Sequence, residues 1–437
     1  MVGKKSGSIL GVASALAVGL FVAHHMSVNV AAQGPSHYIV TFRPGTDRSN
    51  RARTVANHGA ALRFNYSGVD AAAVVVPNDN ALRALSNDPS VMTIVPDRLV
   101  SAYQDVRENA RASGKPGGGS GGGSGQVVPA GVARVGVPTG LSNGDGIGVA
   151  IVDTGIDLGH PDLGFPVDAF SAFGGSCLDD EGHGTHVSGT VAARDNSIDV
   201  IGVAPKAQLY CVKVLDSTGS GSDAEVMAGL DWVLVNHALV HPSIRVINMS
   251  LGRPGSVDDN PSFHELIKSL EAAGVAVVVA AGNDASAEIS QKIPAAYSEV
   301  IAVASATALT GSNQCRRLSA PIAADTASYF TTDGANVVVS APGEDAEDVS
   351  RACLISSTGI LSTRLGGGTT RMSGTSMASP HVAGIVARHF QANSSFTVAD
   401  VRRFLVLDAT RKTVAPFDSP TLSYSFDGIR EGIAKAP

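Results

Sequence analysis

Three short motifs carry a carboxylate, an imidazole and a hydroxyl, which are the groups of nucleophilic catalysis by serine. Asp153 begins Asp-Thr-Gly after an apolar run, His183 begins His-Gly-Thr-His-Val, and Ser376 lies within Gly-Thr-Ser-Met-Ala-Ser-Pro-His. A serine hydroxyl is a weak nucleophile unless a base removes its proton. The three residue types therefore supply a nucleophile, a base and an acid.

Each of these residues also has a purely structural explanation. Asp153 could accept hydrogen bonds from the N–H groups of a turn, and Ser376 could cap the N-terminus of a helix. His183 and His186 have the spacing of a metal-binding pair, but such pairs usually need a third ligand nearby. A histidine at a glycine-flanked helix start beside a strand-end acid suits a general base better.

The elements that must position these residues alternate along the chain. Near-continuous apolar runs predict buried strands over residues 148–153, 209–215, 246–250, 275–280, 300–305 and 337–340. Helices are expected over residues 223–237, 263–273, 377–390 and 398–407. This order indicates an α/β fold, in which a mostly parallel sheet is covered by helices on both faces. Sites in such sheets lie at the carboxyl ends of the strands, where Asp153 is expected.

The composition excludes one class of partner. The chain has 437 residues, with 32 lysines and arginines against 39 acids and a net charge of −7. Surfaces that bind nucleic acid are basic, so no nucleic-acid partner is expected. A hydrophobic fraction of 44% is typical of a globular protein.

Residues 1–32 are predicted to form a signal peptide. Lys4 and Lys5 precede an uncharged apolar stretch over residues 9–23, and a small-residue site ends at Ala32. Cleavage before Gln33 would make the protein secreted, with no membrane contact afterwards. The alternative is an uncleaved anchor, but the apolar stretch is shorter than the roughly 20 residues that a membrane span needs.

Three segments follow the signal peptide. Residues 33–105 are predicted to form a small α+β domain, with strands over 37–42, 71–76 and 91–95 and helices over 50–58 and 80–87. Residues 106–125 form a linker whose Gly/Ser composition predicts a flexible coil, either natural or introduced. Residues 126–437 hold all three motifs.

The three motifs resemble those of the subtilisin family of serine proteases, the subtilases, in residue type and in the chain order Asp, His, Ser. The resemblance implies a triad, for which subtilisin itself is a reference case, in which Ser376 attacks, His183 is the base and Asp153 orients the imidazole. It leaves His186 with a structural role.

Asn283 follows an apolar run and could be a turn asparagine. By the resemblance it donates a hydrogen bond to the oxyanion, with the Ser376 N–H as the second donor.

The resemblance also implies contacts with substrate. Two segments are similar to those that pair with an extended peptide as added β-strands, which predicts broad specificity. Ala280 and Gly282 are expected to line the pocket for the residue before the scissile bond, and Asp284 to admit some basic side chains. Asp223 stands where many relatives have an aromatic residue over the fourth pocket. The two pairing segments are Gly219, Ser220 and Gly221, and Ser250, Leu251 and Gly252.

A structural Ca²⁺ is implied by a loop over residues 194–205 that is similar to the family's calcium loop. Calcium binds six to eight oxygens, including carbonyl and amide oxygens. The alternative is a solvated polar loop. The implied ligands are the side chains of Gln126, Asp162 and Asn196 and the carbonyl groups of Arg194, Ile198 and Val200.

Residues 33–105 resemble the family's propeptide, which acts as a folding template and inhibitor. Its tail would lie through the active site before self-cleavage, with a first cut expected within residues 101–104 and later trimming toward Gln126.

Four cysteines allow three pairings. Cys177 and Cys211 are placed like a disulfide of the aqualysin and proteinase K branch, which leaves Cys315 and Cys353 as the second pair.

These expectations describe a secreted, self-processing, calcium-stabilised serine endopeptidase. It would act as a monomer on polypeptide substrates, with its own propeptide as inhibitor. The alternatives are a selective processing protease or transpeptidase on the same fold, a propeptide-locked storage form, and a non-catalytic binding protein.

Overall fold

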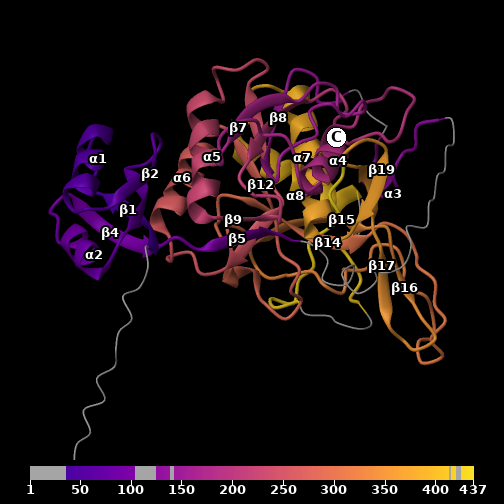
Figure 1. Ribbon diagram of the computed structural model, residues 1–437. Coiled ribbons are helices and arrows are strands. Elements are labelled where there is room, and N and C mark those ends of the chain that lie inside the picture. Colours follow the sequence, from indigo (N-terminus) through magenta and orange to yellow (C-terminus); the bar gives the residue numbers. More distant parts are fainter. Residues whose placement is uncertain (1–35, 104–124, 138–141, 413–414, 420–424) are drawn as a thin grey trace, which may run out of the picture.

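The computed structural model describes residues 36–103, 125–137, 142–412, 415–419 and 425–437 (Figure 1). The predicted signal peptide, and all of the predicted linker except Gly125, lie outside these ranges.

The N-terminal domain is a four-stranded antiparallel sheet with two helices. Its strands lie in the order β2-β3-β1-β4. Asp47 and Asn78 cap the two helices by accepting from backbone N–H groups of the first turn. The α+β architecture is as expected, but β2 is an additional strand. The elements are β1 (Ser36–Phe42), α1 (Arg48–Asn57), β2 (Ala61–Asn65), β3 (Ala71–Val76), α2 (Asp79–Ser86) and β4 (Val91–Pro96).

The main domain is built on a seven-stranded sheet in which every neighbouring pair is parallel. The strand order is β15-β14-β12-β10-β6-β8-β7. This confirms the expected mostly parallel sheet. The strands are β6 (Gly148–Asp153), β7 (Val167–Ser171), β8 (Gln208–Lys213), β10 (Ile244–Met249), β12 (Ala276–Ala280), β14 (Ile301–Thr307) and β15 (Val337–Glu344).

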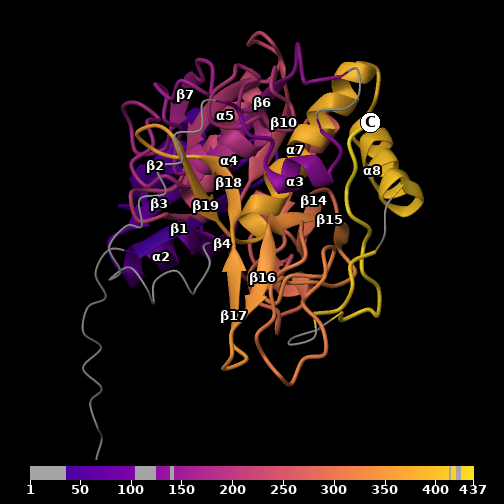
Figure 2. The ribbon, with the colours of Figure 1, turned by 90° about the vertical axis from the view of Figure 1, so that its right-hand side faces the viewer.

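Helices cover both faces of this sheet (Figures 1 and 2). On β6, Ala150 and Val152 belong to one buried core, and Val149 and Ile151 belong to the other. A strand with a core on each side needs apolar residues at every position, which explains the continuous runs in the sequence. The first core includes α5 (Asp223–Asn236) and α6 (Pro261–Ala272), and the second includes α4 (His183–Ala192), α7 (Thr375–Ala392) and α8 (Val398–Lys412).

The N-terminal domain packs beside α5 and α6 (Figure 1). Its residues Ile39, Tyr66 and Ala73 belong to the same buried core as those two helices. From this domain the chain continues into β5 (Leu99–Ala102), which lies between β9 (Ser220–Ser222) and β11 (Leu251–Pro254) of the main domain. A strand of the first domain is thus inserted into the surface of the second.

Several smaller elements complete the described chain. Disulfides join Cys177 to Cys211, as the resemblance implied, and Cys315 to Cys353, the pair that this left. Within the described ranges, no helix combines the length and the apolar character that a membrane crossing requires. The remaining elements are α3 (Ala130–Arg134), η2 (Ile289–Gln291), β13 (Lys292–Ile293) and the hairpin strands β16 (Ala346–Val349), β17 (Ile355–Thr358), β18 (Ile360–Thr363) and β19 (Thr369–Met372).

Candidate active site

Asp153 and His183 form a buried hydrogen-bonded pair. Asp153 is the last residue of β6 and His183 the first residue of α4, and their side chains are at most 2% exposed. Oδ1 of Asp153 lies 2.7 Å from Nδ1 of His183. Burial acts to lower the pKa of His183, but the charge and hydrogen bond of Asp153 outweigh it, so the pKa is raised. In the described structure Nε2 of His183 has no hydrogen-bond partner, so it is free to take a proton.

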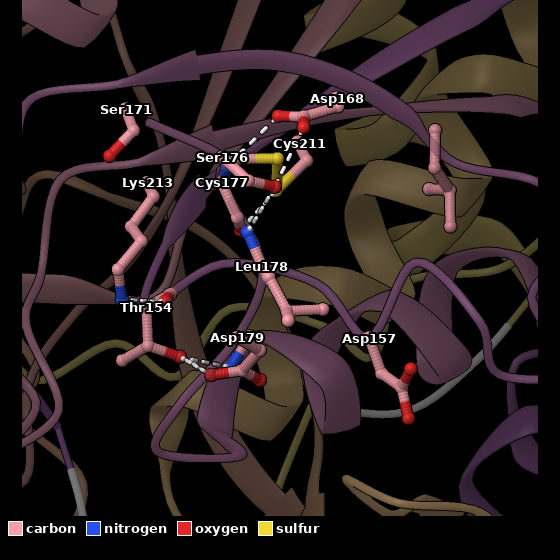
Figure 3. Close-up of a disulfide and its surroundings, with 12 residues drawn as sticks. Thr154, Asp157, Asp168, Ser171, Ser176, Cys177, Leu178, Asp179, Cys211 and Lys213 are labelled. Atoms are coloured by element: carbon pink, nitrogen blue, oxygen red, sulfur yellow. Dashed lines mark hydrogen bonds between the residues drawn. A yellow bond between two sulfur atoms is a disulfide. The ribbon is translucent and has the colours of Figure 1, made fainter. Parts of the chain in front are cut away.

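The loop before α4 is fixed by Asp179 and by a disulfide. The Asp179 carboxylate accepts from the N–H groups of Glu181, Gly182 and Thr185, so it caps the helix that begins at His183. It also accepts from the Thr154 hydroxyl at 2.9 Å, next to Asp153. Figure 3 shows Cys177, two residues before Asp179, joined to Cys211 on β8. The disulfide and the helix cap therefore fix the positions of Asp153 and His183 relative to each other.

Ser376 lies in the first turn of α7 and is buried. Its Oγ is 3.0 Å from the carbonyl oxygen of Tyr103 and 3.0 Å from that of Ser250. The expected hydrogen bond from Ser376 to His183 is absent from the described structure. The hydroxyl instead faces the carbonyl group of the N-terminal segment, which competes for its proton.

Asn283 points its amide at the same carbonyl group. Its Nδ2 lies 3.0 Å from the oxygen of Tyr103. Its Oδ1 accepts from the N–H and hydroxyl of Thr375, at 2.9 and 2.8 Å. These two donors require an oxygen, so they fix the amide with its nitrogen toward Tyr103. The sequence indicated Asn283, but it gave no sign that Thr375 sets its orientation.

The segment ending at Tyr103 pairs with the two segments predicted to bind an extended peptide. β5 pairs antiparallel with β9 and β11, with Ser101 opposite Ser220 and Gly252. Val100 is opposite Gly221, and Ala102 is opposite Leu251. The N–H of Ala102 donates to Gly219 and that of Tyr103 to Ser250, at 2.9 and 3.4 Å. The structure thus brings all six predicted pairing residues, Gly219, Ser220, Gly221, Ser250, Leu251 and Gly252, beside this segment.

The Tyr103 side chain enters the main domain. A Cβ built on Gly252 would overlap its hydroxyl, so glycine is needed there.

The residues expected to line the pocket lie at and after the end of β12. Ala280 is buried at the end of β12, and the N–H of Gly282 donates to the Thr375 hydroxyl at 3.1 Å. Asp284 is paired with Lys292 at 3.2 Å, which offsets the negative charge expected to admit basic side chains.

His186 has the structural role that the resemblance implied. It is buried, and its Nε2 lies 2.9 Å from the carbonyl oxygen of Ile360. Burial lowers the pKa of His186 to about 3, so the ring is neutral. No cluster of three or more His, Cys, Asp or Glu residues suited to a metal occurs in the described ranges.

The predicted calcium ligands come partly together. The Gln126 amide contacts the carbonyl oxygens of Arg194 and Val200. Oδ2 of Asp162 accepts from the N–H of Val200 at 3.1 Å, while Oδ1 is buried with no partner among the described residues. Burial raises the pKa of Asp162 to about 6. A cation beside the unpartnered oxygen would relieve this cost, so these residues fit an ion held by few charges and several neutral oxygens. Oδ1 of Asn196 accepts from the N–H of Ile198 at 3.1 Å, and the Asn196 side chain also hydrogen-bonds to the Asp162 carboxyl, which acts to lower the pKa of Asp162. Among the described contacts, Ile198 meets this set through its N–H and not through its carbonyl group.

Comparison with known proteins agrees with this architecture. Residues 144–424 match the model of the subtilase family. Subtilisin J of Geobacillus stearothermophilus is 32% identical over 405 residues, which cover 88% of this chain and 89% of the relative. Subtilisin Savinase of Lederbergia lenta is 37% identical over 289 residues, which cover 65% of this chain and 92% of the relative.

Two solved structures share the fold. A cold-adapted subtilisin-like serine proteinase superposes with a TM-score of 0.54 at 27% identity and covers 72% of this chain and 99% of its own. Fervidolysin from Fervidobacterium pennivorans, a keratinolytic enzyme related to subtilisin, gives 0.66 at 22% identity, covering 93% of this chain and 61% of its own. The second likeness bears on the fold alone.

The fold and the relatives together define a serine endopeptidase of the subtilisin type. This chain belongs to the subtilase family.

Proposed function

We propose that the protein is a secreted endopeptidase that cuts peptide bonds with Asp153, His183 and Ser376, and that its first substrate is its own chain. One observation supports this most directly. The carbonyl oxygen of Tyr103 accepts from Nδ2 of Asn283 and from the hydroxyl of Ser376 at once. A peptide carbonyl group held between a nucleophile and an oxyanion donor is arranged for acyl transfer.

In the proposed reaction, the Ser376 hydroxyl first turns from the two carbonyl oxygens toward His183. Hydrogen bonds between catalytic groups often tighten only in the reacting complex. Nε2 of His183 takes the proton as Oγ attacks the carbonyl carbon. Asp153 stabilises the imidazolium that forms, while Asn283 and the Ser376 N–H stabilise the oxyanion.

Collapse of the tetrahedral intermediate breaks the C–N bond. His183 returns its proton to the leaving amine, which leaves an acyl group on Ser376. Water then attacks this ester with His183 again as base, and the carboxylic acid and the free serine are released. The residue roles follow the known subtilisin pattern, here assigned to this chain.

The register of β5 supports a first cut after Tyr103. Tyr103 is the residue whose carbonyl oxygen lies at Ser376 and Asn283, so the peptide bond that follows it is the one exposed to attack. This position falls within the range expected from the sequence. The residues up to Gln126 would be trimmed later, and the released N-terminal domain would remain an inhibitor because its tail occupies the groove.

Several broader properties are part of the proposal. Hydrogen bonds between the substrate backbone and β9 and β11 do not depend on the substrate's side chains, so specificity would be broad. Gln126, Asp162, Arg194, Asn196, Ile198 and Val200 would hold one Ca²⁺, which supplies only structural stabilisation. The predicted signal peptide supports an extracellular location, and we propose that the mature enzyme acts as a monomer.

Covalent labelling tests the proposed nucleophile. A fluorophosphonate probe should modify the mature protein once, at Ser376, and abolish hydrolysis of peptide substrates. Ser376→Ala should be neither labelled nor active, while Ser379→Ala, which removes a neighbouring hydroxyl on the same helix, should still be labelled. Labelling elsewhere, or activity in Ser376→Ala, would rule out the assignment.

A further inference from the structure

The groove continues beyond the strand pairing of β5. The N–H of Asp223, at the start of α5, lies 2.9 Å from the carbonyl oxygen of Arg98. Counting back from Tyr103 as the first residue, Arg98 is the sixth. An extended peptide in this register therefore places its own sixth residue against Asp223 by main-chain pairing.

The Arg98 side chain meets a carboxylate that is already fixed. Nη1 of Arg98 lies 2.5 Å from Oδ2 of Asp259, whose side chain is 9% exposed. Arg253 holds the two oxygens of Asp259 at 2.9 and 2.8 Å, and the N–H of Ser256 adds a further bond at 3.2 Å. A Cβ on Gly255 would overlap both Arg253 and Asp259, so glycine makes this close packing feasible. The receptor for Arg98 is thus preorganised.

Around Asp259, the main domain alone has one more negative charge than positive charge. The guanidinium of Arg253 bridges Asp259 and Asp223, with Nε and Nη2 at 2.7 and 2.8 Å from the Asp223 oxygens. Two carboxylates therefore share one buried cation. Asn260 adds a neutral hydrogen bond to Asp223 at 2.9 Å. A cation from the bound peptide supplies the missing positive charge.

The neighbouring positions show that this contact is selective. Leu99 is 81% exposed, so the fifth residue meets little of the enzyme. Val100 is 2% exposed, so the fourth residue is buried and contacts the enzyme through its apolar side chain. The sixth position is the one at which the described groove offers a fixed charge to the N-terminal segment.

We propose that Asp259, oriented by Arg253 and Asp223, forms a subsite that selects a basic side chain six residues before the scissile bond. The inference rests on the proposed protease function and narrows its substrate class to peptides with arginine or lysine at that position. Asp259 contacts the substrate directly, whereas Arg253 and Asp223 are positioning residues.

The test compares two acetylated hexapeptide p-nitroanilides in the mature enzyme. One has the sequence of residues 98–103, and the other has glutamine in place of the arginine. We expect kcat/KM to be about threefold to tenfold higher for the arginine peptide, the range for a partly exposed charge-assisted contact. The ratio should fall toward one in 1 M NaCl, because salt screens the pair.

Asp259→Asn should reduce the ratio of the two peptides to below about twofold, by removing the charge of the receptor. Asp258→Asn is the matched control, since it makes the same charge change at the adjacent, exposed residue and should keep the ratio. Hydrolysis of the glutamine peptide reports on folding of each variant. If Asp259→Asn does not fold, the salt dependence of the wild-type ratio decides the question.

The outcomes separate this inference from the function on which it rests. If the wild type hydrolyses neither peptide, the proposed protease function is wrong. If it hydrolyses both equally, or if Asp259→Asn keeps the wild-type ratio, the subsite is wrong and the protease remains. An effect of Arg98→Gln on release of the N-terminal domain alone, with equal rates for the two peptides, would also overturn the subsite.

Discussion

Asp153 fixes both the orientation and the proton affinity of His183. Because its carboxylate accepts from Nδ1, the lone pair of the neutral ring lies at Nε2. Burial acts to lower the pKa of His183, and the charge of Asp153 reverses this effect. In the proposed mechanism His183 must be neutral to take a proton, so activity should rise as the pH rises through its raised pKa.

The pH dependence of kcat/KM should therefore depend on Asp153. We expect kcat/KM to rise with pH along a limb whose midpoint lies above 6.5, the ordinary pKa of histidine. Asp153→Asn should move the midpoint lower and reduce kcat by about 10⁴-fold, the loss known for such a change in a serine-protease triad. Asp180→Asn is the control, because Asp180 pairs with Lys213 outside the pair. A wild-type midpoint below 6.5, or one that Asp153→Asn does not lower, would contradict the assignment.

Asn283 should act on the transition state more than on substrate binding. Asn283→Leu should lower kcat by about 10²–10³-fold with little change in KM, which is the range measured in subtilisin itself. Thr375→Val keeps the amide but removes one of its orienting hydrogen bonds, so it should cost about tenfold or less. Steady-state kinetics on one peptide substrate measures both. A rise in KM at constant kcat would assign Asn283 to ground-state binding instead.

At the scale of elements, β5 and α5 join the N-terminal domain to the main domain. Both oxygens of Asp231 on α5 accept from the N–H of Ser67, and the N–H of Gly68 lies 2.6 Å from Oδ1. The Asp97 carboxylate accepts from the N–H of Ala224 at 2.9 Å, so one domain caps a helix of the other. We expect these contacts to hold the strand in the groove after the proposed cleavage.

Loss of the Asp231 contacts should speed release of the N-terminal domain. In the full chain of Asp231→Ala, the interval between cleavage, seen by mass spectrometry, and the appearance of peptidase activity should shorten by about 10- to 100-fold. Glu265→Ala removes an exposed carboxylate of α6 and should leave the interval unchanged. An unchanged interval in Asp231→Ala would mean that these hydrogen bonds do not hold the inhibitor.

Strands with two buried faces were predictable from sequence, whereas the exposed strands β2 and β7 were not. β12 is apolar at every position, and β6 is apolar from Val149 to Val152, because a core lies on each side of both strands. In β2 and β7, by contrast, every described residue is at least partly exposed, so no periodic signal marked them. The pairing of β5 with β9 and β11 depends on how two domains meet, which local pattern does not encode.

Over the whole molecule, the candidate site gathers residues that lie far apart in the chain. Asp153, His183 and Ser376 could be identified because each sits in a recognisable motif. The contacts among Arg98, Arg253 and Asp259 could not be predicted, because none of the three residues lies in such a motif and the contacts exist only after folding.

Calcium should stabilise the fold by joining Asp162 to the loop over residues 194–205. Saturating Ca²⁺ at about 100 times Kd adds about 2.7 kcal/mol, so chelation should lower Tm by about 3–5 °C for a domain of this size. Asp162→Asn should remove most of this difference. Asp199→Asn, the same charge change within residues 194–205 at a carboxylate not assigned as a ligand, should retain it. Equal Tm values with and without Ca²⁺ in the wild type would argue against the site.

The most direct measurement of the central claim is the intact mass of the purified full chain beside that of Ser376→Ala. If Ser376 attacks the carbonyl group held by Asn283, the wild type yields an N-terminal fragment ending at Tyr103, and Ser376→Ala remains uncut. The same fragment from both proteins, or a first cut at a different residue of the wild type, would contradict the account.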